Sequence, residues 1–210
     1  KVYRIKGYQI PSSSRISKGL PLVNLIELED DELVQTMVSV KYFGDDHYMF
    51  FATSKGVVKR TALSEFSSIR QNGKIAIKLR EDDELAFAKL TDGKQQIYLG
   101  SSEGKLVRFD EDSIRTLSRN SSGVRGMNLG ENANIVGLAT SSQGDKILTV
   151  TENGYGKLSE ASSYRKSNRG AKGVTTQVIN EKTGKLVSLK AVWGDEDALI
   201  MTSHGTVIRI

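Results

Sequence analysis

The sequence contains 210 residues, 38% of them hydrophobic and 26% charged, with a formal net charge of +5 and no cysteine. A chain of this length can bury a full hydrophobic core, and no apolar run approaches the ~18 residues of a membrane-spanning helix. The lack of cysteine excludes disulfides and thiolate metal sites. We therefore expect a globular, cytoplasmic protein with no membrane partner. Its 20 glycines and 2 prolines are typical of many short strands joined by tight turns.

The chain opens on a short basic segment, Lys1–Ile5, that looks like the middle of a repeating unit rather than its start. We interpret residues 1–40 as the back half of one repeat. The whole sequence is accordingly expected to be a fragment of a longer polypeptide.

Residues 41–91 contain the first complete repeat. Apolar and alternating runs predict four strands, at residues 48–53, 57–61, 74–79 and 85–90. Gly56 lies in the turn between the first two and is expected to adopt a positive φ. Residues 62–66 suggest one helical turn, and residues 81–84 an acidic turn. The same pattern recurs in residues 92–140 and 141–193, and its first half recurs in residues 194–210.

Three sequence markers repeat at a period of about 50 residues, which is typical of a solenoid, a propeller or an array. An acidic motif occurs at Glu29-Asp30-Asp31-Glu32-Leu33 and again at Glu81-Asp82-Asp83-Glu84-Leu85. A turn glycine precedes a short basic strand at Gly56–Arg60, Gly104–Arg108, Gly154–Lys157 and Gly205–Arg209. An arginine precedes a glycine at Arg15…Gly19, Arg70…Gly73, Arg119…Gly123 and Arg169…Gly173. Four strands per unit predict a single all-β domain built of propeller-like blades.

Charge is strongly separated within each repeat. Residues 1–20, 54–80, 104–126 and 153–173 together hold 22 basic and 5 acidic residues, or +17. The rest of the chain holds 8 basic and 20 acidic residues, or −12. Equivalent positions of a blade array lie on the same rim or face, so the basic windows should form one belt. Such a belt predicts a polyanion as the partner, and its sparse aromatic residues favour duplex DNA over a single-strand stacking platform.

The sequence offers little for catalysis or cofactor binding. His47 and His204 are not at metal-ligand spacings, and the two acidic motifs lack the central glycine and spaced ligands of a calcium loop. Residues 153–157 contain glycines but not the spacing of a phosphate loop. We therefore expect a non-catalytic module without its own cofactor. Two other classes stay open: a propeller acting as a protein-interaction platform, and an enzyme with its site in a central funnel.

An ordered set of motifs resembles the C-terminal domain family of bacterial DNA gyrase A proteins, over essentially the whole chain. The motifs are Gly7-Tyr8-Gln9-Ile10-Pro11, Lys18–Asn24, Val58-Lys59-Arg60-Thr61, Asn72–Ile77, Ser122–Gly126, Thr151–Lys157 and Asn168–Gly173. The resemblance implies a β-pinwheel, a propeller-like disc whose neighbouring blades exchange strands. It also implies that duplex DNA wraps around a basic perimeter, which supports ATP-dependent negative supercoiling.

The same resemblance implies partners: DNA, the rest of gyrase A and the gyrase B protein in a chromosome-associated heterotetramer. ATP and Mg²⁺ would act in other parts of that enzyme. From the charge belt and the family we predict fourteen phosphate contacts: Arg4, Arg15, Lys18, Lys59, Arg60, Arg70, Lys74, Arg108, Arg119, Arg125, Lys157, Arg165, Arg169 and Lys172.

Two departures from the family pattern bear on this prediction. The signature box Gln-Arg-Arg-Gly-Gly-Lys-Gly is absent, and Ser167–Gly173 is a degenerate echo of it. Leu158 stands where a basic residue is expected. The related topoisomerase IV protein carries a similar, less regular pinwheel and is the nearest alternative.

Overall fold

A computed structural model describes residues 1–29 and 32–210, so the central Asp30 and Asp31 of the first acidic motif lie outside the described residues. Its contacts divide the chain into two compact units. The first unit comprises residues 1–94 and 114–126, and the second comprises residues 95–113 and 127–210. The predicted single domain and its blade boundaries stay predictions.

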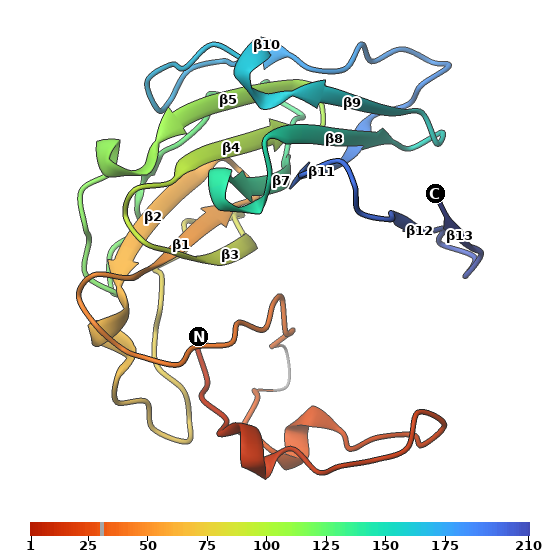
Figure 1. The fold of residues 1–210 in the computed structure, drawn as a ribbon. Coiled ribbons are helices and arrows are strands. Elements are labelled where there is room, and N and C mark those ends of the chain that lie inside the picture. The colour runs from red at the N-terminus through yellow and green to blue at the C-terminus, as the bar shows by residue number, and fades with distance from the viewer. Residues whose placement is uncertain (30–31) are drawn as a thin grey trace. The chain divides into compact units, whose positions relative to one another are not determined.

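The first unit is built on a four-stranded antiparallel sheet in the order β3-β1-β2-β6. Figure 1 labels its strands β1, β2 and β3. Its strands are β1 Tyr48–Thr53, β2 Val57–Ala62, β3 Leu85–Thr91 and β6 Val124–Arg125. The hydrophobic runs supply a core that contains Phe51, Leu63, Phe66, Ala76 and Ala88. The turn between β1 and β2 contains Gly56 at φ +81°, which confirms the predicted left-handed turn residue.

The second unit repeats this sheet in the order β10-β5-β4-β7. Its strands are β4 Gln96–Ser101, β5 Lys105–Asp110, β7 Ile135–Thr140 and β10 Val174–Thr175. A three-stranded sheet in the order β11-β8-β9 follows, with β8 Lys146–Thr151, β9 Gly156–Glu160 and β11 Leu186–Val192. A hairpin of β12 Leu199–Met201 and β13 Val207–Arg209 ends the chain.

Neighbouring repeats exchange strands, which confirms the pinwheel expectation. β6 belongs to the second repeat but pairs with β2 of the first, with Val58 opposite Val124. β10 belongs to the third repeat but pairs with β5 of the second, with Leu106 opposite Val174. An isolated bridge of Val2 with Lys74 repeats this register once more. Each exchange brings one repeat onto the sheet edge of the repeat before it.

The predicted strand at residues 74–79 is wrong, because Lys74 makes that single bridge and no ladder follows. The corresponding segments β6 and β10 are each two residues long. The alternation of this segment predicted that Ile75 and Leu79 face a core, but they are 51% and 42% exposed, and Ala76 between them is buried. A ladder also needs a partner edge along its whole length. The exchanged segment runs along that edge for only two residues before it leaves toward the next turn.

Short helices connect the strands. The helical turn expected at residues 62–66 is a 3₁₀ helix, η3 Leu63–Phe66. The described residues also form η1 Gly7–Gln9, η2 Leu22–Asn24, η4 Glu111–Ser113, η5 Ser141–Gln143 and η6 Ala161–Ser163. Within the described parts of the chain, no helix has the length and apolar character needed to cross a membrane.

Candidate nucleic-acid interface

Basic residues concentrate in four loops that contain no Asp or Glu. We define the basic loops as residues 6–20, 67–80, 115–126 and 165–175. They carry Lys6, Arg15, Lys18, Arg70, Lys74, Lys78, Arg80, Arg115, Arg119, Arg125, Arg165, Lys166, Arg169 and Lys172. With no acid among them, each loop carries an excess of positive charge. Lys166 is paired with Asp110, outside its loop, at 2.7 Å.

Strand exchange seats two of these loops on sheet edges. In the first unit, Leu117 N donates to Arg60 O at 2.8 Å and Gly126 N donates to Gly56 O at 2.8 Å. The loop 115–126 therefore follows the length of β2. In the second unit, Ser167 N donates to Arg108 O at 2.8 Å, and the loop 165–175 follows β5 in the same way. Their charges consequently lie at the outer edge of each sheet.

Glycine makes this close approach possible. Gly123 has φ +90°, and a Cβ there would lie 2.5 Å from Val58 O. Gly173 has φ +82°, and a Cβ there would lie 2.6 Å from Leu106 O. Only glycine combines this backbone with the missing side chain. At Gly123 and Gly173, the arginine-to-glycine spacing in the sequence therefore marks a basic loop that docks on the preceding repeat.

The structure distributes the fourteen predicted residues over three environments. Nine are exposed: Arg4, Arg15, Lys18, Arg70, Arg125, Lys157, Arg165, Arg169 and Lys172. Lys74, Arg108 and Arg119 are half-buried, and Lys59 and Arg60 are buried. The loop residues thus reach solvent more readily than the residues of the basic strands.

Lys59 is fully enclosed, with 0% of its surface exposed. Its Nζ donates to Ala76 O at 2.7 Å and to Arg119 O at 2.5 Å. Burial lowers the pKa of this ammonium to about 8, with Glu65 raising it and Arg119 lowering it further. A buried ammonium already bonded to two carbonyls cannot meet a phosphate, so we place Lys59 outside the candidate interface.

The arginines at the ends of the basic strands connect one repeat to the next. Arg108 donates from Nη1 to the carbonyls of Ala161 and Tyr164, both at 2.9 Å. Its Nε donates to Gln96 Oε1 at 2.9 Å. Arg4 likewise donates to Ser67 O at 2.9 Å from across its repeat boundary. Arg108 and Arg4 therefore hydrogen-bond within the protein, and the sequence alone did not predict these bonds.

Arg60 occupies the same strand position as Arg108 and is 8% exposed. Its guanidinium lies 4.5 Å from the centre of the Tyr48 ring, a cation–π contact. The signal that would have identified these internal arginines is a partner twelve residues earlier, Tyr48 for Arg60 and Gln96 for Arg108. We place Arg60 outside the candidate interface as well.

The residue twelve positions before each of these arginines also bears on Leu158, which stands where a basic residue was expected. Register pairs Leu158 with Leu148, as it pairs Arg60 with Phe50 and Arg108 with Tyr98. Lys146 stands twelve residues before it, where the other repeats have an aromatic or amide side chain. An arginine at position 158 would face a like charge, which is a physical reason for the leucine at this position.

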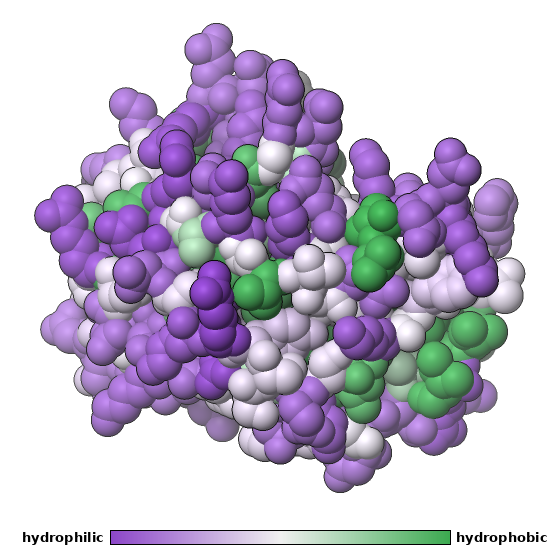
Figure 2. Space-filling view, turned by 90° about the horizontal axis from the view of Figure 1, so that it is seen from above, coloured by the Kyte–Doolittle hydropathy of each residue, from purple (hydrophilic) through white to green (hydrophobic). Residues whose placement is uncertain are grey.

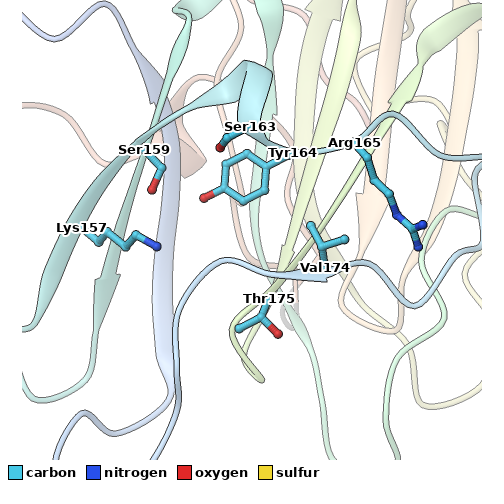
Figure 3. Close-up of a pocket in the computed structure, with 7 residues that line it drawn as sticks. All are labelled: Lys157, Ser159, Ser163, Tyr164, Arg165, Val174 and Thr175. Carbon is cyan, nitrogen blue, oxygen red and sulfur yellow. The ribbon is translucent and has the colours of Figure 1, made fainter.

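A pocket of about 330 Å³ lies along β9 and is lined by Lys157, Ser159, Ser163, Tyr164, Arg165, Val174 and Thr175. Figure 3 shows Lys157 pointing into it from one side, with Arg165 on the other. Lys157 Nζ donates to Thr176 O at 3.2 Å. Two cations, several hydroxyls and no acid make this pocket suited to an anion.

The acidic turn of the first repeat serves the fold. Asp83 Oδ1 accepts from Ser54 Oγ at 3.1 Å, Lys55 N at 3.0 Å and Glu84 N at 2.9 Å. It therefore holds the turn between β1 and β2. Among residues 1–29 and 32–210, no group of three or more His, Cys, Asp or Glu side chains could hold a metal ion.

Figure 2 shows that hydrophilic residues dominate the face viewed from above, with apolar residues in small separate groups. A broad apolar surface would be expected of a stable protein-docking face. The face seen here shows no such broad apolar surface.

Comparison with known protein families agrees with this architecture. The family model described as DNA gyrase C-terminal domain, beta-propeller, matches residues 1–41, 47–92, 95–142 and 145–192. The DNA gyrase A protein of Staphylococcus aureus strain MRSA252 is 49% identical over 213 residues, covering 100% of this chain. The chain spans 24% of the length of that relative.

Two solved structures are similar in fold. The structure of a DNA gyrase A C-terminal domain has a TM-score of 0.84 at 29% identity, covering 99% of this chain and 67% of that one. The crystal structure of the C-terminal domain of a DNA topoisomerase IV has a TM-score of 0.83 at 26% identity, covering 91% and 60%.

Proposed function

Because this chain belongs to the DNA gyrase C-terminal domain family, we propose that it binds duplex DNA along its basic loops and bends it. The observation that carries the proposal is the repeated seating of an acid-free basic loop on a sheet edge. Each repeat would then hold the phosphate backbone at one point of a curved path.

Phosphate contacts explain both the charge and its regular spacing. Lys and Arg that neutralise phosphates release counterions, so affinity falls steeply with salt. Such contacts position the duplex without reading its sequence. Smooth bending of 20–30 bp by 40–90° costs roughly 1–6 kcal/mol, which several such contacts must offset. We therefore expect binding that is insensitive to sequence.

The double-stranded form is favoured over single strands by the composition of the loops. The loops 67–80, 115–126 and 165–175 contain no aromatic residue, and Tyr8 is the one aromatic in residues 6–20. Single-strand binding proteins stack bases on aromatic side chains. Tyr164, next to the third of these loops, is buried and its hydroxyl is bonded to Thr176.

In its parent protein, the module would act with the rest of gyrase A and with gyrase B. The DNA that it wraps would be presented for ATP-driven strand passage, which introduces negative supercoils. Catalysis, ATP and Mg²⁺ would belong to those other parts, and the enzyme would work on the chromosome in the cytoplasm. The chain itself would be a non-catalytic DNA-binding module.

Topoisomerase IV is the second candidate, because the two solved C-terminal domains match this chain almost equally well. Wrapping is tested by binding the chain to nicked circular DNA, religating the DNA and reading the sign of the trapped writhe. A consistent shift of topoisomers supports wrapping. No shift, together with no binding to linear duplex, refutes the proposal and returns the protein-interaction platform as the leading hypothesis.

A matched pair of variants identifies the surface. Arg119→Gln with Arg125→Gln removes two charges from one basic loop, and Lys94→Gln with Lys190→Gln removes two exposed charges outside the loops. Each lost phosphate contact should reduce the slope of log affinity against log salt by about 0.9. We expect a change of about 1.8 for the first pair and almost none for the second. Equal changes would show that general charge, and not the loops, governs binding.

A further inference from the structure

Lys59 bonds to two different repeats. It lies in β2 of the first repeat, and one of its acceptors, Ala76 O at 2.7 Å, belongs to the same repeat. The other acceptor, Arg119 O at 2.5 Å, belongs to the basic loop of the second repeat. Lys59 is 0% exposed, and its ammonium connects this loop to the sheet in the interior.

The bond falls at the centre of the loop's attachment. On one side, Leu117 N donates to Arg60 O at 2.8 Å, and on the other Ser121 O accepts from Lys78 N at 3.1 Å. Lys59 holds the carbonyl between these two points. That carbonyl belongs to Arg119, whose side chain is among the proposed phosphate contacts.

The other repeats provide a natural comparison. Lys157 occupies the same strand position in the third repeat and donates to Thr176 O, the counterpart of Ala76 O. Val107 occupies it in the second repeat and is 1% exposed. An apolar side chain is therefore compatible with the sheet at this position. What Lys59 adds is the bond to the following loop.

We propose that Lys59 is a positioning residue for DNA binding: its ammonium holds the Arg119 backbone, and so sets where the Arg119 guanidinium stands, without touching DNA. The consequence for DNA rests on the proposed function. Ordering the loop during folding removes part of the ordering cost from the binding step. The loop is thus prepared for a phosphate by a residue of the preceding repeat.

The first test is amide hydrogen exchange in the full chain carrying Lys59→Met, which keeps an unbranched apolar stem. We expect the Leu117 amide to exchange about tenfold faster or more, because local opening of the loop costs less free energy. The Thr176 amide, which donates to Gly104 O in the second unit, is the internal control. Unchanged exchange at Leu117 would overturn the holding role.

The second test is duplex affinity for the wild type, Lys59→Met, Arg119→Gln and the double variant. A positioning role predicts a loss of about threefold to tenfold for Lys59→Met alone, and no further loss in the Arg119→Gln background. Additive losses would indicate that Lys59 acts on DNA independently, and would refute the positioning role. If the wild type itself fails to bind duplex DNA, the proposed function fails while the exchange result still decides the role of Lys59 in the loop.

Discussion

The buried ammonium of Lys59 makes a sharp prediction about stability and pH. Its pKa is about 8 in the folded chain, against a usual value of 10.5. Each pKa unit corresponds to about 1.4 kcal/mol, so the difference amounts to roughly 3 kcal/mol. We expect the wild type to gain about this much free energy of unfolding, relative to Lys59→Met, as the pH rises from 8 to 10.5.

The sign follows from proton binding. Between these two pH values the unfolded chain keeps the proton on Lys59, whereas the folded chain has released it. Stability rises with pH wherever the unfolded state binds more protons. Below pH 8 both states are protonated, so the difference between the two proteins should be flat. Because other groups titrate in both proteins, their effects cancel in the comparison.

The assay is urea unfolding of both proteins, followed by circular dichroism at half-unit steps from pH 7 to 10.5. Lys157→Met is the matched control, since it removes the same charge from the same strand position at an exposed site. The wild-type advantage over Lys59→Met should grow above pH 8, and the advantage over Lys157→Met should not. A difference that stays constant or falls would refute the burial argument.

Three further predictions concern the connections between repeats. Gly123→Ala should lower the free energy of unfolding by more than Gly154→Ala. Both variants place alanine at a positive φ, at a cost of about 1–2 kcal/mol, but only the Cβ at position 123 would meet a backbone oxygen, at 2.5 Å. Thermal unfolding compares the two variants, and equal losses would contradict the close approach. Arg108→Met should lower the free energy of unfolding by about 2–4 kcal/mol, because three charge-assisted hydrogen bonds are lost. The slope of log DNA affinity against log salt should not change, and a shallower slope would show that Arg108 contacts a phosphate. Asp83→Ala should cost about 1–2 kcal/mol by freeing the turn between β1 and β2, measured by urea unfolding, and no loss would mean that the turn holds without it.

Many strands and turns could be predicted from the sequence because short local segments specify them. The run Tyr48–Thr53 and the basic strand after Gly56 become β1 and β2 as predicted. A hydrophobic run followed by a turn glycine specifies a hairpin with no help from distant residues. The residues 74–79 show the limit, since their alternation predicts a strand that only a distant partner could form.

The candidate interface, too, could be predicted from the sequence only in part. The loop charges and their spacing are properties of the sequence, and exposed Arg125, Arg169 and Lys172 lie in basic loops where the repeat pattern expects them. Lys59 and Arg60 carry the same charge in an equally regular pattern, yet both are buried. Residue type therefore predicted where positive charges lie along the chain, but not whether each side chain faces solvent or the interior.

The sequence by itself determined the period, the all-β class, the turn glycines and the separation of basic from acidic segments. The tertiary structure decided which basic groups face solvent and which bond to the next repeat. The physical reason is that an ammonium or guanidinium is satisfied equally by a phosphate or by backbone carbonyls. One of the two carbonyls bonded to Lys59 Nζ comes from Arg119, sixty residues away. Only the folded chain brings the two together.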